Sequence, residues 1–171
     1  MKAYLEKFAL IALVAVMSSG CMFSGSNKSV SGGISNSSSF GNGPEQIWLN
    51  KAKGAYKGGN YGLAERYYRH AIEERHQNAE AWLGLAASYD QLKRFDHAKR
   101  AYDVLVKISG YTPSVMNNLA YHHMLKGDFK TARKTLEAAQ KADPNNPYVR
   151  NNIRLLNKWE AKARKARHLP S

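Results

Sequence analysis

The sequence predicts an all-α solenoid built from three helical hairpins and one further helix. Two observations support this prediction: the chain repeats itself every 34 residues, and apolar residues recur at helical spacing within each repeat. Windows that begin at Glu45, Ala79 and Pro113 align without a gap. A hydrophobic content of 43% is sufficient for a core of this size.

Small and aromatic residues return at fixed positions of the repeat. Alanine occupies the eighth and twentieth positions, and an aromatic side chain occupies the seventeenth. The alanines are Ala52, Ala86 and Ala120 at position eight and Ala64, Ala98 and Ala132 at position twenty. Alanine lets two helices approach closely, so each window is expected to be a helix, a short polar turn and a second helix.

These residues and their period resemble the tetratricopeptide repeat. The resemblance divides the chain into residues 45–78, 79–112 and 113–146, followed by a capping helix and basic tail at 147–171. Asp143–Pro144–Asn145–Asn146 matches the family's usual turn between repeats. The resemblance implies a protein-binding solenoid with a concave groove lined by the first helix of each repeat.

Positions two, five, nine and twelve of each repeat supply the groove residues in that family. Carried over by position, the candidates are Leu49, Lys53, Tyr56, Leu83, Asn117, Tyr121, Met124, Asn151 and Leu155. Apolar members would grip a peptide, and the amides of Asn117 and Asn151 would bind its backbone. The alternative is that single members are exposed to solvent or buried against the cap. Leu49 and Lys53 replace the Lys and Asn with which some relatives clamp a C-terminal carboxylate, so that pattern is absent.

The first 21 residues have the pattern of an export signal. Lys2 and Lys7 precede an apolar run at Phe8–Met17, which is too short to span a bilayer as a helix. Small residues then lead to Cys21. Residues 1–20 therefore resemble a bacterial lipoprotein signal, which implies a lipidated Cys21, although Ser18 stands where that family usually has an aliphatic residue. An ordinary secretory signal and an uncleaved anchor are the alternatives.

Residues 21–44 are expected to form a flexible tether after the lipidated cysteine. Residues 22–44 contain eight Ser, five Gly and three Asn, a composition that cannot bury enough apolar surface to order itself. In the lipoprotein family, Met22 after the cysteine favours the periplasmic face of the outer membrane. The periplasm and the inner membrane are the other locations considered.

Positive charge is concentrated near the C-terminus. The whole chain has 26 Lys and Arg against 13 Asp and Glu. Arg150, Arg154, Lys158 and Lys162 follow one another at four-residue steps, so a helix places them along one side. They predict docking to an anionic surface or acidic partner. A solvated helix face is the alternative.

Enzyme classes find no support in the sequence. It contains none of the GxSxG, HExxH, P-loop or dinucleotide-binding motifs, and its single cysteine excludes a disulfide framework. His122 and His123 are neighbours and point about 100° apart on a helix, which suits core or surface histidines better than metal ligands. We expect no enzymatic activity, cofactor, metal or small-molecule substrate.

Four short runs indicate a pathway. NNLA at 117–120, GDF at 127–129, ARKTL at 132–136 and VRNN at 149–152 are similar to the tetratricopeptide lipoprotein of tight-adherence (Flp-type) pilus systems. This resemblance implies an envelope adaptor that supports assembly of the pilus secretin. A general scaffold for outer-membrane protein or peptidoglycan machinery fits the same residues. Nucleic-acid binding through the basic helix is a third possibility, which export disfavours because an exported chain does not meet the nucleoid.

Overall fold

The computed structural model describes residues 43–167 of the 171-residue chain, with the side chain of Arg167 excluded. The predicted signal at 1–20, the predicted lipid attachment at Cys21 and almost all of the predicted tether therefore lie outside the described residues.

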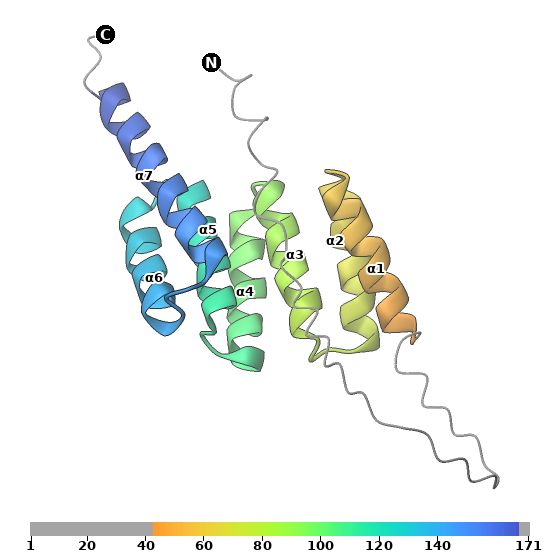
Figure 1. Cartoon of the computed structure of the whole chain (residues 1–171). Helices are drawn as coiled ribbons and strands as arrows, with labels where there is room; N and C mark the ends of the chain where they lie inside the picture. Colours follow the sequence, from red (N-terminus) through yellow and green to blue (C-terminus); the bar gives the residue numbers. More distant parts are fainter. Residues whose placement is uncertain (1–42, 168–171) are drawn as a thin grey trace, which may run out of the picture.

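Helices account for nearly all of this part of the chain, which has no strand between residues 43 and 167. Three hairpins follow one another, and a longer helix closes the array (Figure 1). The helices are α1 (Pro44–Lys57), α2 (Tyr61–Glu74), α3 (Ala79–Gln91), α4 (Phe95–Ser109), α5 (Pro113–Leu125), α6 (Phe129–Ala142) and α7 (Pro147–Arg167). The predicted all-α solenoid is confirmed.

Capping residues explain where several helices begin. Asn60, Asn78 and Asp128 each accept a hydrogen bond from a backbone N–H in the first turn of α2, α3 and α6, which satisfies a donor that the helix itself cannot pair. Proline opens α1 and α5, where its missing N–H is not needed.

The turn inside each hairpin needs a left-handed residue at the same repeat position. Gly59 and Gly127 provide it without strain, with φ of 77° and 79°. The second hairpin has Lys93 there, with φ of 58°. Lys93 therefore has a left-handed backbone conformation that the equivalent turns of the other two hairpins give to glycine.

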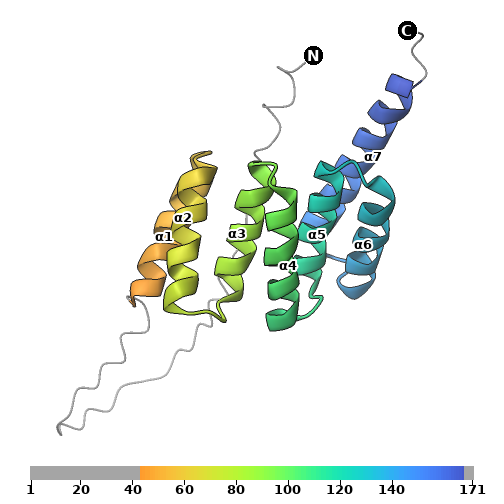
Figure 2. The same cartoon turned by 180° about the vertical axis from the view of Figure 1, so that it is seen from behind.

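First helices form the inner layer of the array. Among the described residues, α1 contacts α3, α3 contacts α5 and α5 contacts α7, whereas the second helices α2, α4 and α6 do not contact one another. The row therefore bends so that the first helices lie on the concave side. Figure 2 shows the same row from behind, with α1 and α7 at opposite ends.

The predicted close helix contacts are present. All six alanines of positions eight and twenty are fully buried. Val149 and Leu156 of α7 are also fully buried, and Ile153 packs beside them. The capping helix therefore seals the third hairpin as predicted.

Two separate hydrophobic cores are present, and α5 lies between them. The first core joins α1 to α4 and ends on Val115 and Leu119 of α5. The second begins with Met116 and Ala120 on the same helix and includes α6 and α7. The two faces of α5 thus belong to different cores.

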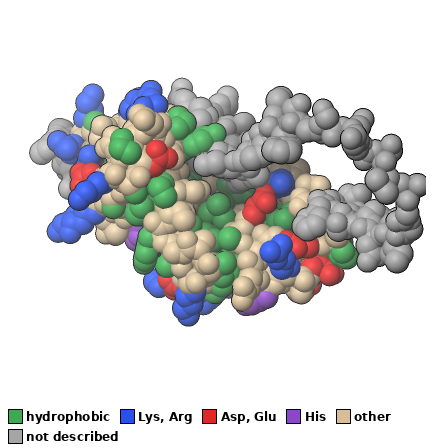
Figure 3. All heavy atoms as spheres, turned by 60° about the horizontal axis from the view of Figure 1, so that its bottom comes forward, with side chains coloured by type: hydrophobic (Ala, Val, Ile, Leu, Met, Phe, Trp, Pro, Cys, Tyr) green, Lys and Arg blue, Asp and Glu red, His purple; other side chains and the backbone are tan. Residues whose placement is uncertain are grey.

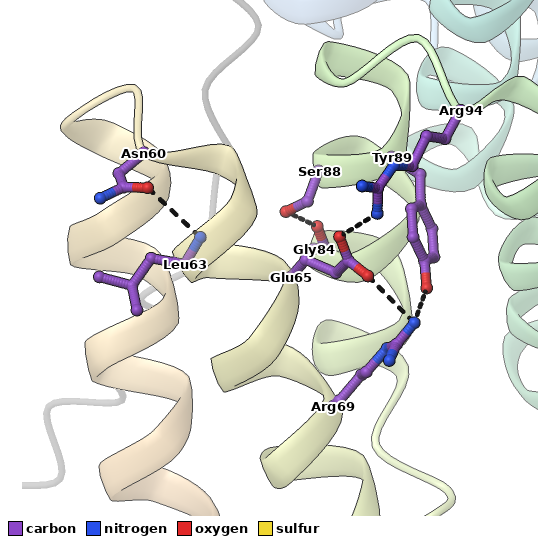
Figure 4. A network of polar contacts seen from close by, with 8 residues as sticks. All are labelled: Asn60, Leu63, Glu65, Arg69, Gly84, Ser88, Tyr89 and Arg94. Atoms are coloured by element: carbon purple, nitrogen blue, oxygen red, sulfur yellow. Dashed lines mark hydrogen bonds and ion pairs between the residues drawn. The ribbon is translucent and has the colours of Figure 1, made fainter.

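A buried carboxylate holds the first hairpin against the second. Glu65 of α2 pairs with Arg69 at 3.0 Å and with Arg94 at 2.8 Å. Arg69 also donates to the hydroxyl of Tyr89 at 2.8 Å (Figure 4). That bond to Tyr89, the largest influence, raises the pKa of Arg69. Glu65 therefore ties α2 to the hairpin that follows.

A different acid lies where the second hairpin meets the third. Asp90 of α3 and His122 of α5 are both buried, with Oδ1 and Nδ1 2.6 Å apart. The hydroxyl of Tyr102 donates to the other carboxylate oxygen at 3.1 Å. Burial raises the pKa of Asp90, and the bond to His122 opposes that rise. We call these three residues the Asp90 network.

Candidate functional site

Four of the predicted groove residues are uncharged and partly exposed, and they come from three successive helices of the inner layer. Leu83 of α3, Asn117 of α5, and Asn151 and Leu155 of α7 all keep part of their surface open. Two are apolar and two carry amides, so together they offer both kinds of contact that a peptide needs.

Leu49 and Met124 do not belong to this surface. Each is only 1% exposed, Leu49 within the first core and Met124 within the second. Their surface is already covered by neighbours in the chain, so the prediction that they line the groove is wrong for both.

Tyr56 and Tyr121, two more of the predicted groove residues, are nearly buried, with 9% and 8% of their surface exposed. Burial raises the pKa of the Tyr56 hydroxyl, and the nearby Tyr61 and Tyr121 add to the rise. Burial also raises the pKa of Tyr121, against a hydrogen bond with Gln91. Both hydroxyls remain protonated and neutral, so neither tyrosine contributes a charge.

Lys53 is neutralised by a partner on the next first helix. Its Nζ lies 2.9 Å from Oε1 of Glu80, and both side chains are about one-third exposed. The predicted groove cation is thus part of an ion pair between α1 and α3.

Asn117 is held by a residue that the sequence did not single out. Nδ2 of Asn152 donates to its Oδ1 at 2.9 Å, and Asn152 is buried. This bond fixes the side chain of Asn117 and leaves its own NH₂ group out of the contact. Asn151, which was expected to act beside Asn117, is the adjacent residue and is partly exposed.

The four α7 residues that were predicted to contact an anionic partner are all exposed. Arg150, Arg154, Lys158 and Lys162 form no ion pair within the described residues, whereas Glu160 is taken by Arg133 and Arg164. Figure 3 shows Lys and Arg side chains gathered toward the end of the molecule that α7 occupies.

Between residues 43 and 167, the Nδ1 of His123 is the one buried side-chain nitrogen or oxygen atom without a hydrogen bond, although the side chain itself is partly exposed. This atom lies 3.6 Å from Oδ2 of Asp128. Burial lowers the pKa of His123, and the neighbouring His122 adds to that effect.

Two further features bear on the kind of site. Within residues 43–167, no group of three His, Cys, Asp or Glu is placed to hold a metal ion. No helix in this range is long and apolar enough to cross a membrane.

Hairpins of this length, stacked with their first helices on the concave side, define a helical-repeat solenoid. Family models described as "Tetratricopeptide repeat" match residues 55–110 and 113–146. Over these residues the chain belongs to the tetratricopeptide repeat family. No curated protein sequence matches the chain significantly.

Solved structures share this fold. The TPR domain of Arabidopsis OM64 superposes with a TM-score of 0.60 at 21% identity, covering 67% of this chain and 95% of that one. The Yersinia enterocolitica type III secretion translocator chaperone SycD gives 0.60 at 18% identity, with coverage of 77% and 99%. The TPR2B domain of yeast Sti1, solved as a pHsp70 complex, gives 0.61 at 17% identity, with coverage of 70% and 98%.

Proposed function

We propose that this protein is a peptide-binding adaptor whose concave face holds an extended, largely uncharged segment of a partner protein. The observation that carries the proposal is the set of partly exposed residues Leu83, Asn117, Asn151 and Leu155, which runs across α3, α5 and α7. Leu83 and Leu155 would take apolar side chains of the partner. Asn117, already oriented by Asn152, would bind its backbone.

Structures with the same fold support this mode of binding. SycD has been solved in complex with a peptide of the translocator YopD, at 22% identity to this chain and a TM-score of 0.57. In this chain, Leu49 is buried and Lys53 is paired with Glu80. Neither is arranged to bind a terminal carboxylate, so we propose that the bound segment is internal to its partner.

We further propose that the adaptor works at the bacterial cell envelope. The support is the signal-like pattern of residues 1–20 and the cysteine that follows it. A lipidated Cys21 and the Ser/Gly/Asn-rich tether would hold the solenoid at the outer membrane. Similarity to the tight-adherence pilus lipoproteins makes the pilus secretin the partner we propose.

Site-specific crosslinking tests the concave face directly. A photoreactive phenylalanine analogue would replace Leu83 or Leu155 on the concave face, and Arg66 or Arg100 on the second helices as exposed controls. Irradiation of cells should yield a discrete crosslinked partner only from the first two positions. Equal crosslinking from the second helices would overturn the assignment of the face.

Partner and anchor are tested separately. Mass spectrometry of the crosslinked product should identify a secretin, whereas an outer-membrane assembly or peptidoglycan component would assign the adaptor to a different envelope machine. Radioactive fatty acid should label the wild-type chain and not a Cys21→Ser variant. Absence of label from both would remove the lipid anchor and leave the peptide-binding proposal standing.

A further inference from the structure

The basic residues of α7 lie on the side opposite its buried face. At about 100° per residue, Val149, Asn152 and Leu156 point in directions within about 60° of one another. Arg150, Arg154, Lys158, Lys162 and Lys165 share an arc of about 120° whose centre is roughly half a turn away. Asn151 lies in the same arc near Lys162, so this arc adjoins the proposed peptide-binding residues at that edge. We call these five residues the α7 basic face.

No acid interrupts this face. Glu160 is the only acidic residue of α7, and it points toward α6, where Arg133 binds it at 2.7 Å. All five cations are exposed and none is paired within the described residues. The positive charge is therefore uncompensated over a straight distance of about 22 Å, at about 1.5 Å per residue.

The helix also continues beyond what the core requires. Leu156 is the last buried residue of α7, and no residue from 161 to 166 is buried. In Figure 1 the C-terminal turns of α7 extend past the adjoining hairpin. These turns add Lys162 and Lys165 to the basic face.

We propose that the α7 basic face binds the anionic phospholipid headgroups of a bilayer, giving the protein a second membrane contact at the end opposite α1. Charge complementarity supports this occupant, since such a surface attracts a Lys/Arg cluster strongly. The arc has no large apolar side chain, so the helix rests at headgroup level and is not inserted into the bilayer.

Shape favours a bilayer over an acidic peptide. A peptide is bound best between two walls, but the basic face is centred about half a turn from the side of α7 that packs against α5 and α6. A planar surface, in contrast, can contact all five cations of a straight helix together. The proposed lipid anchor makes such a surface available, and in that respect the inference rests on the proposed function.

Vesicle flotation tests the inference without depending on the lipid anchor. The probe protein is the full chain with Cys21→Ser, mixed with vesicles of phosphatidylcholine alone or with phosphatidylglycerol added. The test variant replaces Arg150, Arg154, Lys158 and Lys162 with Gln. The control variant replaces Arg66, Lys93, Arg100 and Lys107 with Gln as well, so that it loses the same amount of charge from exposed positions elsewhere.

We expect the parent chain to prefer the phosphatidylglycerol vesicles and to lose that preference at high salt. The test variant should bind them roughly 600-fold more weakly, because it removes four cations and each cation near an anionic surface strengthens binding about fivefold. The control variant should lose much less of its binding to these vesicles.

Three results would overturn the inference: equal binding by the test variant, an equal loss in the control variant, or no preference for phosphatidylglycerol. Binding of a poly-glutamate peptide that requires the four residues, without vesicle binding, would assign the face to an acidic peptide. Circular dichroism of both variants verifies that their helices are intact. Failure of vesicle binding leaves the crosslinking result of the concave face unaffected, so the two proposals fail separately.

Discussion

The ring of Tyr68 on α2 lies directly against the backbone of Gly84 on α3, with no α3 side chain between them. Tyr68 is fully enclosed at this contact, and a methyl group at position 84 would overlap its ring. The close packing of the first two hairpins thus depends on the absence of one side chain.

Gly84→Ala should lower the free energy of unfolding by about 2 kcal/mol. Alanine is the better helix former by roughly 1 kcal/mol, but forcing a methyl group into a filled core costs more than that gain. Urea denaturation measures the change. Gly54→Ala in α1 is the matched control because nothing lies near its added methyl group, and it should be stabilising. A neutral or stabilising Gly84→Ala would contradict the contact.

His122→Phe should destabilise the fold by about 3 kcal/mol, because it leaves the buried Asp90 carboxylate with only the Tyr102 hydroxyl. Adding Asp90→Leu removes the stranded charge and should recover much of the loss. The coupling between the two sites is measured by a double-mutant cycle in urea. Additive effects would show that the two side chains do not depend on each other.

Stability should fall on acidification, partly through His123. Its pKa is lowered in the folded protein, so the unfolded chain binds the proton more readily. The stability is therefore fully present above the ordinary histidine value of about 6.5 and is lost as the pH falls toward the lower folded value. His123→Gln should lose less stability than the wild type between neutral and mildly acidic pH in thermal melts. An unchanged pH profile would exclude His123 as a source.

Lys93→Gly should stabilise the protein by about 0.5–1 kcal/mol. The left-handed backbone at this turn costs a lysine energy that glycine does not lose, and this gain exceeds the extra entropy of glycine in the unfolded chain. The reverse change at the equivalent turn, Gly127→Lys, should be destabilising. The two variants, compared by thermal melting, should move in opposite directions.

A chain that ends after Glu160 should keep the melting temperature of the intact protein within a few degrees, because no later residue of α7 is buried in the described structure. Leu156→Ala, in contrast, should cost about 3 kcal/mol, since Leu156 is fully buried in the second core. Calorimetry of both variants tests this division of α7 into a packed half and an exposed half. A large loss on truncation would show that the exposed half also supports the fold.

Periodicity was sufficient to predict the hairpins, their buried alanines and the seal formed by α7. It could not predict contacts between residues at different repeat positions. Asp90 and His122 are 32 residues apart, and Asn117 and Asn152 are 35 apart, so comparison at 34-residue intervals brings neither pair together. Gly84 shares its position with Asn50 and Asn118, and so the repeat gives no signal for it.

The burial of Leu49 and Met124 was missed for a related reason. Transfer by position assumes that each first helix presents the same side to solvent. Leu49 and Met124 are instead enclosed by the first and second cores, which the alignment of windows does not distinguish. Which of the predicted groove residues are exposed could therefore be learned only from the structure.

Helix α5 connects the packing of the two cores. Val115 and Leu119 anchor the helix to the hairpins before it, while Met116 and Ala120 anchor it to the hairpin and cap behind it. A rotation of α5 about its axis must disturb both sets at once. Asn117, on the same helix, is where we propose that a partner binds. A partner that rotated α5 on binding would therefore disturb the packing toward both ends of the array.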